Sequence, residues 1–280
     1  VVLTSEGLVL TNHHVIAGST SIKVAVAGTT KTYTAKVVGY DATHDIAVIQ
    51  LQGASGLTVA PLGDSDTVKV GDVVIGLGNA GGKGGKPIPA DGKVTGLNKS
   101  ITAMNSESGT SEDLSGLIET DAAIQPGDSG GALVSRDGKV IGIVTAGSIS
   151  GGRTTSATDG YAVPVNQALE IAQQIRDGKA SATVHIGESA FLGIQVSTSS
   201  ASSTNGVRVS GTVSGSAAEK LGLKAGDRIT ALDGRKVTDN ASLRAIIAPH
   251  HPGDTVSITW TDTSGRSHSS SITFGTGPVA

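Results

Sequence analysis

The sequence predicts a mainly β protein built from two domains. Its 280 residues are enough for two separate hydrophobic cores. Through the first half, nearly every apolar run is short, rich in β-branched residues and bounded by turn residues, a pattern typical of barrels and sandwiches. Glycine occurs 40 times and aromatic residues make up only 2% of the chain. We therefore expect many turns and cores built from aliphatic side chains.

Short apolar runs mark the strands of the first domain. They are Leu8–Leu10, Ser21–Val26, Ala35–Tyr40, Ile46–Leu51, Val73–Leu77 and Gly116–Asp121. The irregular, Gly-rich segment 78–96 and the polar segment 105–115 are predicted as loops. Lysines among the glycines of the first loop could suggest nucleotide binding, but the GxxxxGK[ST] spacing is absent. A surface loop is the favoured interpretation.

The first half contains one predicted helix, Val165–Arg176, in which the apolar residues Leu169, Ala172 and Ile175 recur every three residues. Asn166 is positioned to cap it. The polar segment that follows suggests a linker over residues 177–188. The sequence thus predicts a first domain of residues 1–176 and a second of residues 189–280.

A serine lies in an unusual loop, Gln125–Gly131, which reads QPGDSGG. Glycines on both sides of Ser129 permit a tight turn in which backbone N–H groups converge beside the hydroxyl. The amides of Gly127, Asp128 and Ser129 could then hold an oxyanion. An apolar run and a second strand follow, so the loop is expected at the leading edge of a β-hairpin.

The two partners that a serine nucleophile needs lie upstream. A serine requires a histidine base, usually held in one tautomer by a carboxylate. His13 and His14 close the first strand in the run Thr11–Val15, and Asp45 opens the strand Ile46–Leu51. The adjacent histidines could also suggest a metal, but neighbours in a strand point to opposite faces and no acidic partner stands at ligand spacing. No metal and no cofactor are expected.

These three segments, TNxHV, DIAV and GDSGG, resemble the signatures of trypsin-like serine peptidases of the HtrA type. The resemblance implies a chymotrypsin-type double β-barrel with His14 as base, Asp45 as its orienting carboxylate and Ser129 as nucleophile. His13 then occupies the variable position of the motif, and His44 has no role. Asp128 departs from the asparagine more usual in this family, and Ala80 departs from its Gly-Asn-Pro segment.

The same resemblance bounds the specificity. Ala123, six residues before the nucleophile, corresponds to the base of the primary pocket, and the run Thr145, Ala146 and Gly147 corresponds to its wall. Without a carboxylate at the base, cleavage after Lys or Arg is not expected. We expect cleavage after small or medium aliphatic residues.

The second half resembles a bacterial PDZ domain, an α+β fold, over the run 217–234. In that family the loop here formed by Phe191, Leu192, Gly193 and Ile194 offers amides to a C-terminal carboxylate, and the peptide adds a strand to the sheet. The segment 242–248 would be the helix beside the groove. The resemblance implies unfolded proteins and C-terminal peptides as partners, and a homotrimer for the full-length protein.

Composition excludes several other classes. A net charge of −3 without a basic patch argues against nucleic acid as a partner. The chain has no cysteine and no apolar window long enough to cross a bilayer. It begins inside a strand, so we expect the first barrel strand and an export or anchor segment upstream, and an extracytoplasmic location.

Two alternatives compete with an active peptidase. A peptide-binding or chaperone module with a reversibly locked site stays open, because the serine loop could turn its amides away without any change in sequence. An esterase is disfavoured, because Gly127–Gly131 matches the Gly-x-Ser-x-Gly elbow only nominally and precedes a strand instead of a helix.

Overall fold

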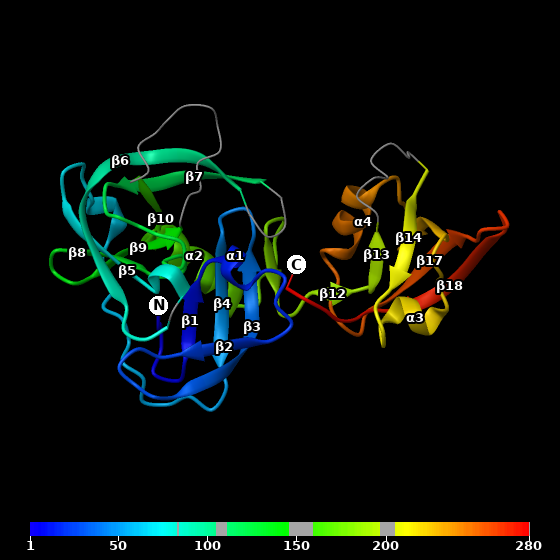
Figure 1. The fold of residues 1–280 in the computed structure, drawn as a ribbon, viewed down its shortest axis with the longest axis horizontal. Coiled ribbons are helices and arrows are strands. Elements are labelled where there is room, and N and C mark those ends of the chain that lie inside the picture. Colours follow the sequence, from blue (N-terminus) through cyan, green and yellow to red (C-terminus); the bar gives the residue numbers. More distant parts are fainter. Residues whose placement is uncertain (83, 105–110, 146–158, 197–204, 280) are drawn as a thin grey trace. The chain divides into compact units, whose positions relative to one another are not determined.

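The computed structural model describes residues 1–82, 84–104, 111–145, 159–196 and 205–279. These residues divide into two compact units, the first built from Val1–Ala17 and Ser21–Ile186 and the second mainly from Gly187–Ala280. Strands dominate both units (Figure 1). The mainly β class predicted from the sequence is confirmed.

The first half of the first unit is a five-stranded antiparallel sheet. Its strands follow the order β1-β4-β3-β11, and β2 pairs with the N-terminal part of β3. The bounds are β1 (Leu8–Thr11), β2 (Ile22–Ala25), β3 (Thr32–Asp41), β4 (Ile46–Leu51) and β11 (Val184–Ile186). The strand β4 is almost entirely buried, as its continuous apolar run predicts.

The second half of this unit is a closed barrel with the strand order β10-β7-β6-β5-β8-β9 (Figure 1). The bounds are β5 (Val73–Gly78), β6 (Ile88–Met104), β7 (Ser111–Thr120), β8 (Ala132–Ser135), β9 (Val140–Thr145) and β10 (Gly160–Pro164). Closure gives each strand two neighbours and removes the exposed edges that invite aggregation. Two short 3-10 helices, η1 (Ser65–Thr67) and η2 (Ala80–Gly82), lie in its loops.

Three segments differ from the sequence prediction. The strand β6 begins inside the predicted loop 78–96, and β7 begins inside the predicted loop 105–115. The strand β11 lies in the segment 177–188, predicted as a linker. In each case pairing with a distant strand explains the difference: β6 pairs with β5 and β7, and β11 pairs with β3. For the starts of β6 and β7, such contacts outweigh the weak local β preference of glycine and polar residues.

The helices of the first unit give one confirmed and two wrong predictions. Helix α2 (Val165–Arg176) has the predicted bounds. Asn166 does not cap it, because Pro164 is the N-cap residue and Ser65 Oγ accepts the hydrogen bond of the Asn166 backbone N–H at 3.1 Å. The predicted strand through Val15 is also wrong, since β1 ends at Thr11 and the short helix α1 (His13–Ile16) follows.

A shared core joins the two halves of the first unit. Leu10 and Val48 from the sheet, Ile143 and Val163 from the barrel, and Ile175 from α2 belong to one cluster of buried side chains. The loops that meet above this core are therefore anchored on both sides by packed strands. Close packing of this kind limits the movement of the strand ends from which these loops start.

The second unit is an α+β domain with its own core. Its main sheet has the order β13-β14-β15-β17-β18, β16 pairs with β15, and β12 pairs with β19. The strand bounds are β12 (Ala190–Phe191), β13 (Ile194–Val196), β14 (Val207–Thr212), β15 (Arg228–Leu232), β16 (Arg235–Lys236), β17 (Thr255–Thr261), β18 (Ser267–Thr273) and β19 (Gly275–Thr276). Its helices are α3 (Ala217–Leu221) and α4 (Asn240–Ile247), the latter close to the predicted helix 242–248.

Candidate active site

His14 and Asp45 form a hydrogen-bonded pair. His14 Nδ1 lies 2.8 Å from Asp45 Oδ2, and the His14 backbone N–H donates to Asp45 Oδ1 at 2.9 Å. The Asp45 side chain is 1% exposed and that of His14 is 29% exposed. A carboxylate in this position holds the proton on Nδ1, so that Nε2 is the nitrogen able to accept a proton from a nucleophile.

The backbone of Asp45 adopts an uncommon conformation. Its φ of 54° lies in the left-handed region, which costs a non-glycine residue about 1 to 3 kcal/mol. The preceding turn is closed by a second His–Asp pair: Asp41 accepts hydrogen bonds from the His44 backbone N–H at 3.1 Å and from His44 Nδ1 at 2.8 Å. His44, to which the sequence assigned no role, therefore braces the turn that carries Asp45.

His13 lies away from this pair. Its side chain is buried, and its ring stacks on Tyr40 with 4.8 Å between centroids. Tyr40 in turn stacks on His185 at 5.0 Å. Because the two adjacent histidines begin helix α1 instead of ending a strand, their side chains diverge by the helical turn, and His14 is the one beside Asp45.

Thr145 contacts Asp45 from the other half of the unit. Its hydroxyl donates a hydrogen bond to Asp45 Oδ2 at 2.9 Å, and the residue is 1% exposed. The sequence assigned Thr145 to the wall of the specificity pocket and gave no indication of this bond. The other two residues of that predicted wall, Ala146 and Gly147, lie outside the described residues.

The Thr145→Val substitution is expected to lower kcat/KM about tenfold, because a hydrogen bond to an ionised group contributes about 1.5 to 3 kcal/mol. Valine keeps the shape and suits the strand. Steady-state hydrolysis of a peptide substrate measures the effect. Ser65→Ala, which removes a buried hydroxyl in η1, is the control and should retain wild-type kcat/KM; equal losses in both variants would contradict a role for Thr145 at the site.

Ser129 lies in the loop between β7 and β8. Gly127 and Gly130 on either side have φ values of 100° and 78°, which only glycine adopts at little cost. The Gly130 N–H donates to Asn12 Oδ1 at 2.6 Å and to the Val144 carbonyl at 2.9 Å. The first bond holds the residue next to Ser129 against the segment that precedes His14, and the second holds it against β9.

The predicted oxyanion donors do not have equivalent surroundings. The Asp128 N–H donates to the Gln125 carbonyl at 3.0 Å, within its own turn. Gly127 and Ser129 remain as candidate donors.

The Asp128 side chain lies in a buried position. The residue is 3% exposed; its Oδ2 accepts a hydrogen bond from the Gln125 N–H at 2.9 Å, and its Oδ1 has no hydrogen-bond partner among the described residues. It packs against Gly78, where a side chain would collide with it.

A residue that the sequence analysis missed lies beside the predicted pocket base. Ala123 is exposed. Its neighbour Ile124 is partly buried and packs against Gly76 of β5 and Gly160 of β10, where a Cβ would collide with its side chain. Ile124 is therefore the apolar candidate for the floor of a substrate pocket. In the sequence, the feature that could have indicated this role is the position of Ile124, a large apolar residue directly before the loop Gln125–Gly131.

The predicted peptide-binding loop joins β12 to β13. Leu192 is buried in the core, and Phe191 and Ile194 are partly exposed. Gly193 has a φ of 79°, and its carbonyl accepts hydrogen bonds from Ser216 Oγ at 3.2 Å and from the Val213 N–H at 2.9 Å. The loop is thus tied down through its carbonyl groups.

Helix α4 of this unit is capped at its start. Asp239 accepts a hydrogen bond from the Ser242 backbone N–H at 2.7 Å, and the Ser242 hydroxyl completes a capping box. The bond from the Ser242 N–H lowers the pKa of Asp239 below its usual value. The helix beside the predicted groove therefore has a fixed beginning.

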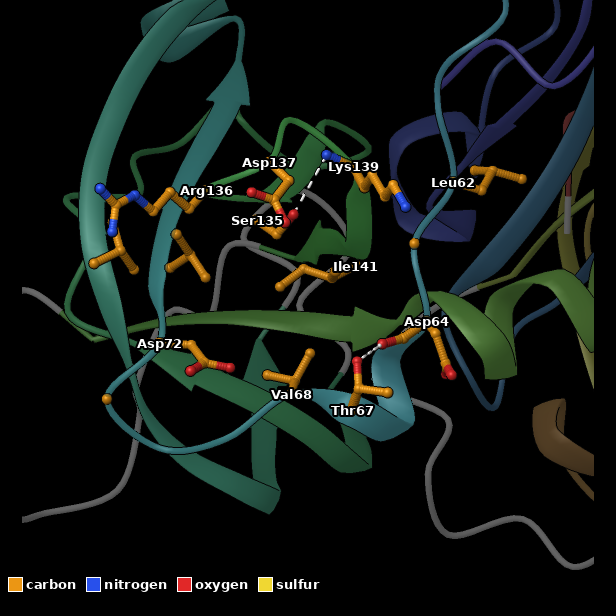
Figure 2. Close-up of a pocket in the computed structure, with 14 residues that line it drawn as sticks. Leu62, Asp64, Thr67, Val68, Asp72, Ser135, Arg136, Asp137, Lys139 and Ile141 are labelled. Atoms are coloured by element: carbon orange, nitrogen blue, oxygen red, sulfur yellow. Dashed lines mark hydrogen bonds between the residues drawn. The ribbon is translucent and has the colours of Figure 1, made fainter.

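A separate hollow of about 800 Å³ lies on the first unit (Figure 2). Val68, Val74 and Ile141 are among its apolar residues, and Asp72 and Arg136 are among its polar residues. None of its lining residues belongs to the predicted triad.

Among the residues that the structure describes, no three His, Asp or Glu side chains gather as metal ligands. No helix in this part of the chain is both long and apolar enough to span a membrane.

Comparison with known families identifies both units. A trypsin-like peptidase domain matches residues 1–143, and a PDZ domain matches residues 190–261. Among solved structures, the chain is similar to an HtrA-type protease, AlgW, with a decapeptide: TM-score 0.54 and 30% identity, covering all of this chain and 82% of the other. The serine endoprotease from Yersinia pestis has a TM-score of 0.51 and 26% identity, over 99% and 87% of the two chains.

Curated relatives give the same picture. The chain is 40% identical to a probable periplasmic serine protease do/HhoA-like of Haemophilus influenzae, over 96% of this chain and 55% of the relative. It is 37% identical to the serine protease PepD of Mycobacterium tuberculosis, over 98% and 60%. It is 36% identical to the periplasmic pH-dependent serine endoprotease DegQ of Escherichia coli, over 92% and 54%. The chain thus spans little more than half the length of these relatives.

Proposed function

The chain belongs to the trypsin-like peptidases of the HtrA type with a PDZ domain, and on that premise we propose that it is a serine endopeptidase in which His14, Asp45 and Ser129 act together. One observation supports this most strongly: a buried carboxylate lies 2.8 Å from His14 Nδ1 and accepts a second hydrogen bond from Thr145. A carboxylate so held stabilises an imidazolium that forms beside it.

The reaction proceeds through an acyl-enzyme. His14 Nε2 takes the proton of Ser129 as the hydroxyl attacks a peptide carbonyl, and later gives it to the leaving amine. The amides of Gly127 and Ser129 stabilise the oxyanion, at about 3 to 4 kcal/mol per donor in comparable sites. Water then attacks the acyl group with His14 again as base, which releases the second product and restores the hydroxyl.

The substrates are unfolded or mistargeted proteins cleaved after small or medium aliphatic residues. Ala123 brings no charge to the pocket, and the partly buried side chain of Ile124 supplies an apolar surface. Because an apolar pocket cannot compensate the desolvation of a cation, cleavage after Lys or Arg is disfavoured.

The PDZ unit binds C-terminal peptides of substrates or activators through the loop Phe191–Ile194. The similar HtrA-type protease AlgW has a structure with a decapeptide, which supports peptide binding. An extended peptide can add to a sheet edge such as β13. Two relatives are described as periplasmic, which supports an extracytoplasmic location. The homotrimer implied by the family stays a prediction.

Digestion of casein by the purified chain, followed by mass spectrometry of the new C-termini, tests the proposal. We expect Val, Ala and Leu to dominate before the cut, and a hydrophobic C-terminal peptide to raise the rate. Strong cleavage after Arg would contradict the pocket assignment. If neither cleavage nor fluorophosphonate labelling occurs with or without peptide, the locked peptide-binding module becomes the better interpretation.

A further inference from the structure

The segment before His14 contains a buried asparagine with an unexpected use. Asn12 occupies the N-cap position of helix α1, where an asparagine side chain normally accepts a hydrogen bond from the first turn. Here its side chain makes no capping bond. The residue is fully buried, so both ends of its amide need partners elsewhere.

Both partners belong to the proposed catalytic machinery. Asn12 Nδ2 donates to the Asp45 backbone carbonyl at 2.8 Å. Asn12 Oδ1 accepts from the Gly130 N–H, the amide directly after Ser129, at 2.6 Å. One rigid amide therefore joins the segments of all three catalytic residues, since Asn12 itself lies two positions before His14. From this juxtaposition we infer that Asn12 is a positioning residue, which fixes Asp45 and the Ser129 loop relative to His14.

The conformation of Asp45 explains why such a residue is needed. A left-handed backbone at a non-glycine residue persists only where its surroundings hold it. The Asp45 N–H makes only a long turn bond of 3.4 Å to the Ala42 carbonyl, whereas its carbonyl receives the shorter bond from Asn12. Loss of that donor allows the peptide after Asp45 to rotate, which moves the carboxylate away from His14 Nδ1.

The position of the Ser129 loop also depends on the hydrogen bond to Asn12. Gly130 lies so close to Thr11 that a Cβ on the glycine would collide with it. The loop therefore lies directly against the segment Thr11–Asn12, and the 2.6 Å bond to Asn12 fixes its position together with the bond of the same N–H to the Val144 carbonyl at 2.9 Å. A misplacement of about 1 Å at a catalytic group can cost about 100-fold in rate.

The inference rests on the proposed function, and Asn12→Ala tests it. We expect kcat to fall about 100-fold while KM changes less than about twofold, because the substrate contacts are intact. The matched control is Asn166→Ala: Asn166 also bridges separate segments, donating to Asp64 Oδ1 at 2.7 Å and accepting from the Ser65 N–H at 3.4 Å, far along the chain from the triad. It should lose some thermal stability, less than Asn12→Ala because Asn166 is only partly buried, and keep its kcat.

The Asn12→Asp variant adds a second measurement, the pH dependence of its activity, which a general loss of stability would not change in the same way. Its ionised carboxylate still accepts from Gly130 but repels the Asp45 carbonyl, whereas its protonated form can donate to that carbonyl as asparagine does. Burial favours the neutral acid. The deficit relative to wild type at the same pH should therefore shrink as the pH falls and the acid form becomes populated. A deficit that is constant with pH would overturn the inference.

NMR of the His14 ring separates failure of this inference from failure of the proposed function. In ¹⁵N-histidine-labelled protein, the Nδ1–H signal of His14 should be protected by Asp45, lost or exchange-broadened in Asn12→Ala, and unchanged in Asn166→Ala. This readout requires no turnover. If the wild type proves inactive but Asn12→Ala alone disturbs the signal, the positioning role stands and the proposed function fails. If the signal and kcat are both unchanged in a folded Asn12→Ala protein, Asn12 has no such role.

Discussion

Ser129→Ala is expected to abolish acyl-enzyme formation and to lower kcat by about 10⁶-fold, the loss typical of removing the nucleophile from a catalytic triad. The fold should survive, because Gly127 and Gly130 determine the shape of the loop and the serine side chain only has to reach its surface. Labelling with a fluorophosphonate probe and hydrolysis of a peptide substrate measure the two effects. Thermal unfolding should show a midpoint close to that of the wild type.

The control for this variant is Ser135→Ala. Ser135 ends β8, the strand that follows the serine loop, and is partly buried like Ser129. It should be labelled at the wild-type rate. Undiminished labelling of Ser129→Ala would show that another residue is the nucleophile, and the mechanism above would have to be abandoned.

Asp45→Asn is expected to lower kcat by about 10⁴-fold with the geometry intact. Asp45 Oδ1 and Oδ2 both accept hydrogen bonds, from the His14 backbone N–H and from His14 Nδ1 and Thr145 Oγ1. An asparagine must place its NH₂ at one of these positions. Beside Nδ1 it also opposes the Thr145 hydroxyl and turns the ring into the tautomer that cannot take the proton of Ser129, and beside the backbone N–H it opposes that one donor.

The chain offers a close control in Asp41→Asn. Asp41 is as deeply buried as Asp45 and accepts the same two kinds of hydrogen bond, but from His44. Its replacement should lower the unfolding midpoint and reduce kcat by no more than about tenfold. Were the two variants equally impaired, the loss would reflect the stability of the turn and not the chemistry of the carboxylate. Steady-state kinetics beside thermal unfolding distinguishes these outcomes.

Local patterns were sufficient for much of the fold, whereas the pairing of His14 with Asp45 was implied by the resemblance to a known family. Helix α2 was predicted with its bounds because its apolar residues recur at helical spacing, and β4 because its apolar run is continuous. By contrast, β11 and the early part of β6 were missed. The start of β6 contains Pro, Asp and Gly, which have little intrinsic β preference, and β11 has only three residues in a polar segment. Both pair with a distant strand that supplies their hydrogen bonds.

The roles of Asn12 and Thr145 could not be predicted for the same reason. The sequence pattern placed Asn12 in the run Thr11–Val15 that closes a strand, and the family resemblance placed Thr145 in the wall of the specificity pocket. Their bonds to Gly130 and Asp45 join residues 118 and 100 positions apart. No local periodicity encodes contacts over such separations, since they arise from the way the two halves of the first unit pack on their shared core.

The 118-residue separation between Asn12 and Gly130 also has a consequence for the newly synthesised protein. Ribosomes add about 5 to 20 residues per second, so the serine loop emerges roughly 6 to 24 s after the segment that will hold it. Contacts of such high contact order form late, after the loop-closure entropy has been overcome. If the proposed function holds, a nascent chain carries His14 and Asp45 for many seconds before Ser129 reaches them, and it gains peptidase activity only after its own barrel has closed.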